Sequence, residues 1–157
     1  TVCSLKQAKG VLAATDKSNK PVWISFSVDD TDGTKLRSGE KLEDVEAVIN
    51  NHLVEAVLIN CSPPEVVDNA LSILSNMGKA FGAYANGFSK ISPEFLKTRP
   101  TVDALTARND LGPEEYSNFV TNWIRNGASI VGGCCEIGPT HISKISQKIH
   151  KLGYKTL

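Results

Sequence analysis

Ala56-Val57-Leu58-Ile59-Asn60-Cys61-Ser62-Pro63-Pro64 carries the chain from a buried strand directly into a helix. The run from Ala56 to Ile59 is apolar, as expected of a strand whose two faces are both covered in a parallel sheet. The paired prolines end that strand, and proline is favoured in the first turn of the helix that follows. This helix is predicted by an inward stripe of Val67, Ala70, Leu71 and Leu74. The unit therefore places a cysteine at the carboxyl end of a strand.

The same strand–helix pattern recurs along the 157-residue chain. We expect a helix over residues 4–17 and then strands at 22–28, 56–61, 80–86 and 130–134, each followed by a helix. The last helix begins at Pro139 and should bury a stripe of Ile142, Ile145, Ile149 and Leu152. Strands that alternate with amphipathic helices predict an α/β fold with parallel (β/α) units and right-handed crossovers.

The length sets the expected organisation of the chain. Residues 1–157 are the size of a single domain. Residues 87–112 show no clear periodicity, and a segment of that length usually forms a functional loop or carries small helices.

Composition and charge exclude several classes of protein. The chain has 17 basic and 17 acidic residues, so it has no net charge with which to attract nucleic acid. No apolar run approaches the ~20 residues of a membrane span, and the start shows no signal peptide. Four cysteines in a chain of this length do not resemble a secreted disulfide framework. We therefore expect a cytoplasmic protein that binds neither nucleic acid nor membranes.

Three of the four cysteines stand at the predicted carboxyl ends of strands. Cys61 ends one strand, and Cys134 and Cys135 end another, and such ends meet at one edge of a parallel sheet. Thiolates are soft ligands that suit zinc, and three protein ligands leave one position for a substrate. Adjacent ligands require the chain to turn at this pair, because neighbouring strand residues point in opposite directions. The pattern predicts a Zn²⁺ site that would activate a thiol substrate.

Other interpretations of these cysteines stay open on the pattern alone. A buried free cysteine commonly acts as a small apolar side chain, which is also the expected role of Cys3. The adjacent pair could form a vicinal disulfide. His141 is a rival fourth ligand that would close the shell and make the zinc structural. No CxxC spacing strengthens the metal interpretation.

Two cysteine motifs resemble those of the homocysteine S-methyltransferase family. One is Ile130-Val131-Gly132-Gly133-Cys134-Cys135 with the following Gly138-Pro139-Thr140-His141-Ile142, and the other is Ile59-Asn60-Cys61-Ser62. Phe26-Ser27, Gly33 and Leu36-Arg37-Ser38-Gly39 are similar to the family's fifth-strand region. The resemblance runs over nearly the whole chain, with one departure where Ala85 stands in place of the family's usual proline before Asn86.

The resemblance implies a (β/α)8 TIM barrel and a reaction. Cys61, Cys134 and Cys135 would be the zinc ligands of an enzyme that transfers a methyl group from an activated donor to the thiol of homocysteine, forming methionine. Ser25, Asn60 and Asn86 are candidate substrate-binding residues near strand ends. The resemblance does not decide the donor, which could be S-methylmethionine, betaine or a methyl-folate. A selenium analogue of the acceptor would fit the same residues.

The resemblance also implies that this chain corresponds to half a barrel, strands five to eight. Family members are about twice as long, and the family's first-strand Asp-Gly-Gly motif and the acidic residue before Thr1 are absent here. Four parallel strands leave two edges and an inner face uncovered. We therefore expect the N-terminal half of the barrel or a second copy of the chain as a partner, or an open sheet with low activity. A structural zinc module and a non-catalytic half-barrel that docks on a partner half are the alternative functions.

Overall fold

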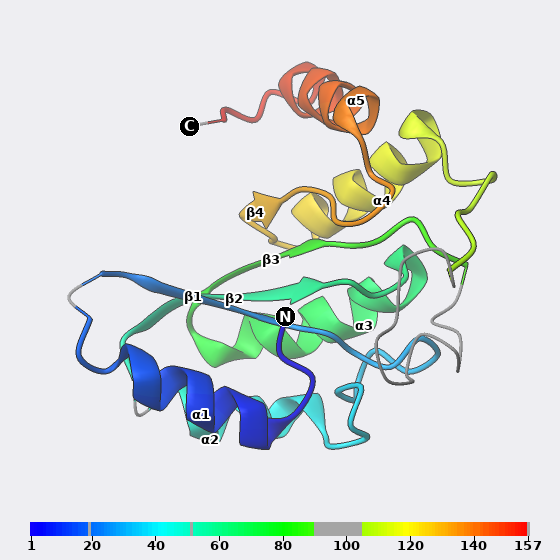
Figure 1. Ribbon diagram of the computed structural model, residues 1–157. Coiled ribbons are helices and arrows are strands. Elements are labelled where there is room, and N and C mark those ends of the chain that lie inside the picture. Colours follow the sequence, from blue (N-terminus) through cyan, green and yellow to red (C-terminus); the bar gives the residue numbers. More distant parts are fainter. Residues whose placement is uncertain (19, 51, 90–104, 157) are drawn as a thin grey trace.

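The computed structural model describes residues 1–18, 20–50, 52–89 and 105–156 and contains a four-stranded sheet (Figure 1). All strand pairs are parallel and lie in sequence order, which confirms the predicted α/β class. The strands are β1 (Val22–Phe26), β2 (Val54–Asn60), β3 (Ala80–Tyr84) and β4 (Ile130–Val131). The register pairs the end of β1 with β2 through Phe26 and Ile59, and the end of β2 with β3 through Asn60 and Tyr84. The carboxyl ends of β2 and β3 therefore lie level.

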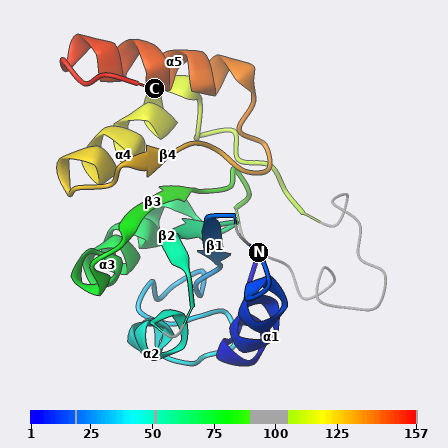
Figure 2. The same cartoon turned by 90° about the vertical axis from the view of Figure 1, so that its left-hand side faces the viewer.

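Helices follow the strands around the sheet, from α1 and α2 beside β1 to α4 and α5 beyond β4 (Figures 1 and 2). Three of the starts match the sequence signals, because the Ser4 side chain caps the first helix, Pro64 opens the third and Pro139 opens the last. The helices are α1 (Leu5–Thr15), α2 (Val45–Ile49), α3 (Pro64–Leu74), α4 (Pro113–Arg125) and α5 (Pro139–Lys151), with short 3₁₀ helices at Leu42–Asp44 and Ser75–Met77. None of the helices in the described ranges is long and apolar enough to cross a membrane.

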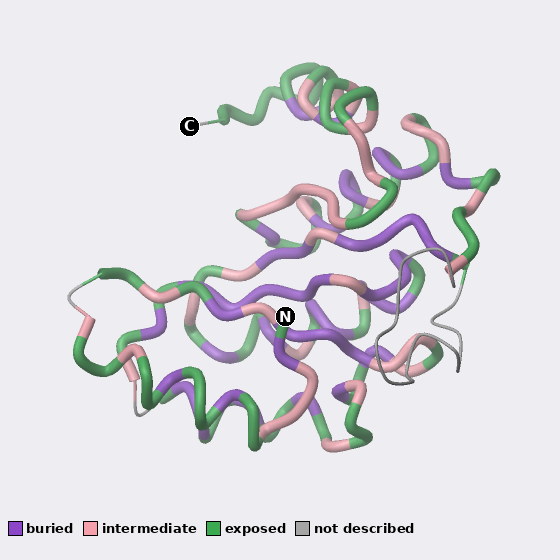
Figure 3. The backbone as a smooth tube through the Cα atoms, viewed as in Figure 1, coloured by how far each residue is buried: buried purple, intermediate pink, exposed green. Residues whose placement is uncertain are grey.

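In the part of the chain that the structure describes, helices pack on one face of the sheet and none covers the other (Figure 2). On β1, Ile24 and Phe26 are buried in the core shared with the helices, whereas Trp23 is 59% exposed on the opposite face. The strands carry much of the buried backbone in Figure 3, and the outward turns of the helices are exposed. This asymmetry is expected of an incomplete barrel, in which helices cover the outside and the inside lacks its opposing strands.

The N-terminal residues extend the sheet beyond β1. Val2 donates its N–H to the carbonyl of Ser25 at 2.9 Å and accepts from the N–H of Ser27, also at 2.9 Å. The two bonds form a parallel bridge between Val2 and Phe26, so this edge of the sheet is already partly paired.

Some bounds of the predicted elements are wrong. The predicted strands at 22–28, 80–86 and 130–134 end earlier, at Phe26, Tyr84 and Val131, although the N–H of Cys134 still donates to the carbonyl of Ala85. Ile142 and Leu152 are 43% and 42% exposed, since α5 turns only Ile145 and Ile149 into the core. The predicted loop at 87–112 lies largely outside the described residues, which leave out 90–104.

Gly82 brings β3 and β4 close enough to pair, so we expect Gly82→Ala to destabilise the fold. A Cβ at this position would lie 1.7 Å from the carbonyl oxygen of Ile130, and the strands would have to separate. Overpacking of this kind costs roughly 1–3 kcal/mol in the free energy of unfolding, measurable by urea denaturation.

Gly10→Ala is the matched control, because a Cβ there meets nothing within 4 Å. It lies in the middle of α1, where alanine should raise the free energy of unfolding by about 0.5–1 kcal/mol. Equal behaviour of the two variants would contradict the close approach of β3 and β4.

Candidate metal centre

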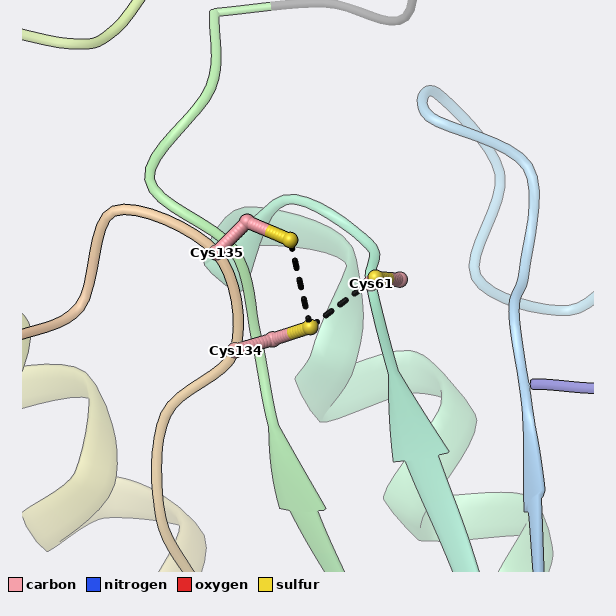
Figure 4. A group of neighbouring side chains, drawn as sticks. All are labelled: Cys61, Cys134 and Cys135. Atoms are coloured by element: carbon pink, nitrogen blue, oxygen red, sulfur yellow. Dashed lines mark hydrogen bonds between the residues drawn. The ribbon is translucent and has the colours of Figure 1, made fainter. Parts of the chain in front are cut away.

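Three cysteine side chains converge beyond the carboxyl ends of β2 and β4 (Figure 4). The sulfur of Cys134 lies 2.9 Å from that of Cys61 and 3.8 Å from that of Cys135. All three sulfurs lie within 4.8 Å of one another. Among the His, Cys, Asp and Glu side chains of the described residues, these three form the group whose ligand atoms lie close enough together to hold a metal ion. The sequence-predicted ligands are therefore brought together.

Cys61 reaches this cluster from a sharp turn at the end of β2. Its φ angle is 51°, in the left-handed region that non-glycine residues rarely adopt. The turn is tied to both neighbouring strands. Ser27 donates its hydroxyl to the carbonyl of Asn60 at 2.8 Å, and Asn86 donates its N–H to the carbonyl of Ser62 at 3.1 Å. These bonds connect the Cys61 turn to the ends of β1 and β3.

The second turn lets two adjacent cysteines point to one place. Cys134 donates its N–H to the carbonyl of Ala85 at 2.9 Å, while Gly87 donates to the carbonyl of Cys135 at 2.8 Å. Gly133 has no room for a side chain, because a Cβ would lie 2.1 Å from the side chain of Ile137. The predicted change of direction at the cysteine pair is thus present, and it depends on close contact with the segment after β3.

Mutual contact shifts the ionisation of the three thiols. A hydrogen bond from Cys61 lowers the pKa of Cys134 to about 6 despite its partial burial. The same bond, together with burial, raises the pKa of Cys61, and burial beside Cys134 raises that of Cys135. One thiolate, on Cys134, is therefore favoured at neutral pH, and a bound cation would favour the ionised form of the other two.

The donor set fits a thiophilic metal. A tetrahedral zinc with Zn–S bonds of about 2.3 Å separates its sulfurs by roughly 3.8 Å. The Cys134–Cys135 separation of 3.8 Å matches this value, and the Cys61–Cys134 separation of 2.9 Å is shorter. All four cysteines are free thiols, so no disulfide competes for these sulfurs.

His141 does not join the three cysteines. Its Nδ1 accepts a hydrogen bond from the N–H of Gly138 at 3.2 Å, and its Nε2 lies 3.2 Å from the carbonyl of Leu111. Because Nδ1 accepts, Nε2 carries the proton and donates, so both ring nitrogens are used. Cys3 also lies outside the cluster, at the residue before the cap of α1.

The three candidate substrate-binding residues lie in different environments. Ser25 accepts a hydrogen bond from the hydroxyl of Tyr84 at 2.5 Å on the uncovered inner face. Asn60 donates to the hydroxyl of Thr1 at 2.6 Å, while its amide oxygen is buried without a hydrogen-bond partner in the described chain. Asn86 accepts from the N–H of Phe88 at 3.1 Å. Ser25 also lines a groove of about 370 Å³ that includes Gly132 and Gly133.

Two residues beside the centre were not predicted to contact it. Tyr116 is fully buried in α4, and its hydroxyl donates to the carbonyls of Gly132 at 2.8 Å and Ala85 at 3.2 Å. Arg37 donates to the carbonyl of Cys61 at 3.2 Å. The sequence marks Tyr116 as an apolar helix residue and Arg37 as part of a motif that resembles the family, but neither pattern indicates a hydrogen bond to a carbonyl far along the chain.

Comparison with known proteins gives one consistent family. The family model described as homocysteine S-methyltransferase matches residues 1–149. Homocysteine S-methyltransferase 1 of Arabidopsis thaliana is 30% identical over 147 residues, which are 92% of this chain and 42% of the relative. Selenocysteine Se-methyltransferase of Brassica oleracea var. italica is 30% identical over 131 residues, or 82% of this chain and 35% of the relative.

A crystal structure gives the same fold. The metallated form of the homocysteine methyltransferase MmuM from Escherichia coli superposes with a TM-score of 0.69 at 21% identity, over 93% of this chain and 42% of that one. The chain thus spans less than half the length of these relatives. Its sheet corresponds to part of a (β/α) barrel, and by the match over residues 1–149 the chain belongs to the homocysteine S-methyltransferase family.

Proposed function

We propose that this chain provides the zinc-binding half of an enzyme that transfers a methyl group to the thiol of homocysteine, forming methionine. The observation that supports this most strongly is the convergence of the Cys61, Cys134 and Cys135 sulfurs within 4.8 Å at the carboxyl edge of the sheet. Three thiolate ligands leave one tetrahedral position for a substrate thiol. A centre of free thiols also needs a reducing compartment, which supports a place in the cytoplasm.

The chemistry needs a thiolate at neutral pH. A free thiol has a pKa near ~8.5 and is mostly protonated, whereas a bound zinc ion favours its deprotonated form. The three cysteine ligands follow the ends of strands and therefore have fixed positions. A homocysteine sulfur bound at the fourth position would thus be oriented toward the donor. In the transfer, the homocysteine sulfur loses its proton and supplies the electron pair of the new S–CH₃ bond. The bond between the methyl group and the donor's leaving atom breaks and leaves its electron pair there.

Substrate recognition is proposed for Ser25, Asn60 and Asn86. Asn60 offers a buried amide oxygen beside Cys61, which could accept a hydrogen bond from the amino group of the substrate. Ser25 lies on the inner face, where the groove of about 370 Å³ opens toward Gly132 and Gly133. The name of the Brassica relative supports a seleno-amino acid as an alternative acceptor. S-methylmethionine, betaine and methyl-folate are all candidate donors.

Residues 1–157 are proposed to act as a single half-barrel unit. The uncovered inner face and the Val2 bridge at the β1 edge suit the N-terminal half of a barrel as the partner. A second copy of the chain is the other candidate. A closed structural zinc module is less well supported, because both ring nitrogens of His141 have other partners.

We expect Cys61→Ala to abolish both zinc binding and methyl transfer. Two sulfurs cannot hold the ion as three do, since each ligand contributes directly to the coordination shell. The zinc content of the purified protein, measured by elemental analysis, should fall from one ion per chain to none. Methyl transfer is measured in a version extended to the length of the relatives.

Cys3→Ala is the matched control, because Cys3 lies outside the cluster. It should keep one zinc ion per chain. X-ray absorption at the zinc edge should count three sulfur ligands without homocysteine and four with it. Full activity of Cys61→Ala, or an unchanged sulfur count with homocysteine, would remove the ligand assignment.

His141→Ala should leave the zinc content unchanged and lower stability. The substitution removes the hydrogen bonds to Gly138 and Leu111 at the start of α5, which should cost about 1–3 kcal/mol in unfolding free energy. Elemental analysis and urea denaturation measure the two effects, with the exposed His150→Ala as the control. Loss of zinc from His141→Ala would instead favour the closed structural site.

Trp23 should report closure of the barrel. It is 59% exposed on the inner face, so covering that face should shift its fluorescence emission to shorter wavelength. We expect this shift when the chain is extended to the length of the relatives, and Trp23→Phe should remove the shifted component while the buried Trp123 stays constant. A concentration-dependent shift in the 157-residue chain would identify a second copy as the partner.

A further inference from the structure

We propose that Arg37 is a positioning residue for the metal centre. Its guanidinium, held by Asp30, fixes the carbonyl of Cys61 and thereby keeps that cysteine in the conformation that directs its sulfur toward Cys134. The inference rests on the proposed metal site and extends it to a residue that touches none of the sulfurs. Arg37 Nη2 contacts both the Asp30 carboxylate and the carbonyl of Cys61, and Figure 4 shows the side chain of Cys61 beside those of the other two cysteines.

The Cys61 turn needs external support. A left-handed conformation is disfavoured for an L-residue, because Cβ approaches the following carbonyl oxygen, and Cys61 has a φ of 51°. Three successive carbonyls of the turn each accept a hydrogen bond from a different part of the chain. Asn60 accepts from the Ser27 hydroxyl at 2.8 Å, Cys61 from Arg37 Nη2 at 3.2 Å, and Ser62 from the Asn86 N–H at 3.1 Å.

The hydrogen bond from Arg37 holds the peptide group between Cys61 and Ser62. The orientation of this carbonyl follows the backbone angles of Cys61, and the same backbone sets the direction of the Cα–Cβ bond. The outer two bonds hold the peptides before and after it. A charged donor forms a stronger hydrogen bond to a carbonyl than a neutral one does. Arg37 is therefore suited to hold the middle peptide, on which the position of the sulfur depends.

Arg37 is itself rigidly placed. Its N–H donates to the carbonyl of Ser27 at 3.0 Å, at the end of β1. The segment before it folds back on itself through the antiparallel bridge between Val28 and Leu36, and both of these residues are fully buried. At the tip, Gly33 packs so tightly that a Cβ would lie 2.0 Å from the carbonyl oxygen of Val66 in α3. The support for Arg37 is thus part of the core.

Asp30 completes the arrangement. Its carboxylate lies 2.8 Å from Arg37 Nη2, and the two side chains are 11% and 21% exposed, respectively. The same nitrogen contacts both the carboxylate and the Cys61 carbonyl, so Asp30 sets where the guanidinium can donate. The carboxylate also offsets the positive charge, so the pair adds little net field at the sulfurs. The expected effect of Arg37 is therefore on the geometry of the ligands and less on their ionisation.

Removing Arg37 should weaken metal binding by the chain. We expect Arg37→Met, which keeps a long stem without the donor, to lower Co²⁺ affinity by about 10–100-fold, as other outer-shell changes do. Competition with a chelator measures the affinity, and the sulfur-to-cobalt charge-transfer bands and the ligand-field bands report the coordination geometry. Arg37→Lys should recover part of the affinity, because an ammonium can still donate to the carbonyl. Asp30→Asn should give an intermediate loss.

Lys35→Met is the matched control. Lys35 pairs with Asp32 at 2.9 Å in the same loop, and its side chain is 52% exposed and away from the turn. It should leave affinity and spectrum unchanged, and circular dichroism checks that every variant is folded. Unchanged binding and spectra in Arg37→Met, or an equal loss in Lys35→Met, would overturn the positioning role. If the unsubstituted chain bound no Co²⁺, the proposed function would fail and this inference with it.

Discussion

The candidate centre depends on the register of the parallel strands, which places their carboxyl ends side by side. Asn60 at the end of β2 pairs with Tyr84 at the end of β3, and Ala83 pairs with Val131 in β4. Since all strands run in one direction, the residues that follow them emerge at one edge. Side chains separated by dozens of positions in sequence therefore meet without a dedicated binding loop. The strand pairing that builds the fold also assembles the cluster.

Backbone hydrogen bonds between the turns convert this rough proximity into a defined cluster. The Cys61 turn bonds to the segment after β3 through Ser62 and Asn86, and that segment bonds in turn to Cys134 through Ala85. The hydroxyl of Tyr116 connects the segment after β3 with the segment after β4, because it bonds to the carbonyls of Ala85 and Gly132. The three turns thus form one hydrogen-bonded layer above the sheet. A shift in any one of them would move at least one sulfur.

Much of this arrangement was predictable from the sequence, because strand order and helix starts depend on local patterns. The apolar runs located the strands, the prolines at 64 and 139 located the starts of two helices, and the motifs located the cysteines. The two-residue length of β4 was not predictable, since the apolar run continues beyond Val131 and the N–H groups of Gly132 and Cys134 still donate to the carbonyls of Ala83 and Ala85. The roles of Tyr116 and Arg37 depend on contacts with carbonyls far along the chain, which leave no periodic signal. The exposure of Ile142 likewise depends on how α5 lies against its neighbours.

The separation of 73 residues between Cys61 and Cys134 links the cluster to the order of folding. Closing so long a segment is entropically costly, and the contact is made only when β2, β3 and β4 are all in place. Nascent or partly assembled chains would therefore offer at most the adjacent pair of thiols and hold a soft cation weakly. An ion would then bind only after the sheet has formed and would stabilise it. Loss of the ion would first destabilise β4, the two-residue strand at the edge of the sheet.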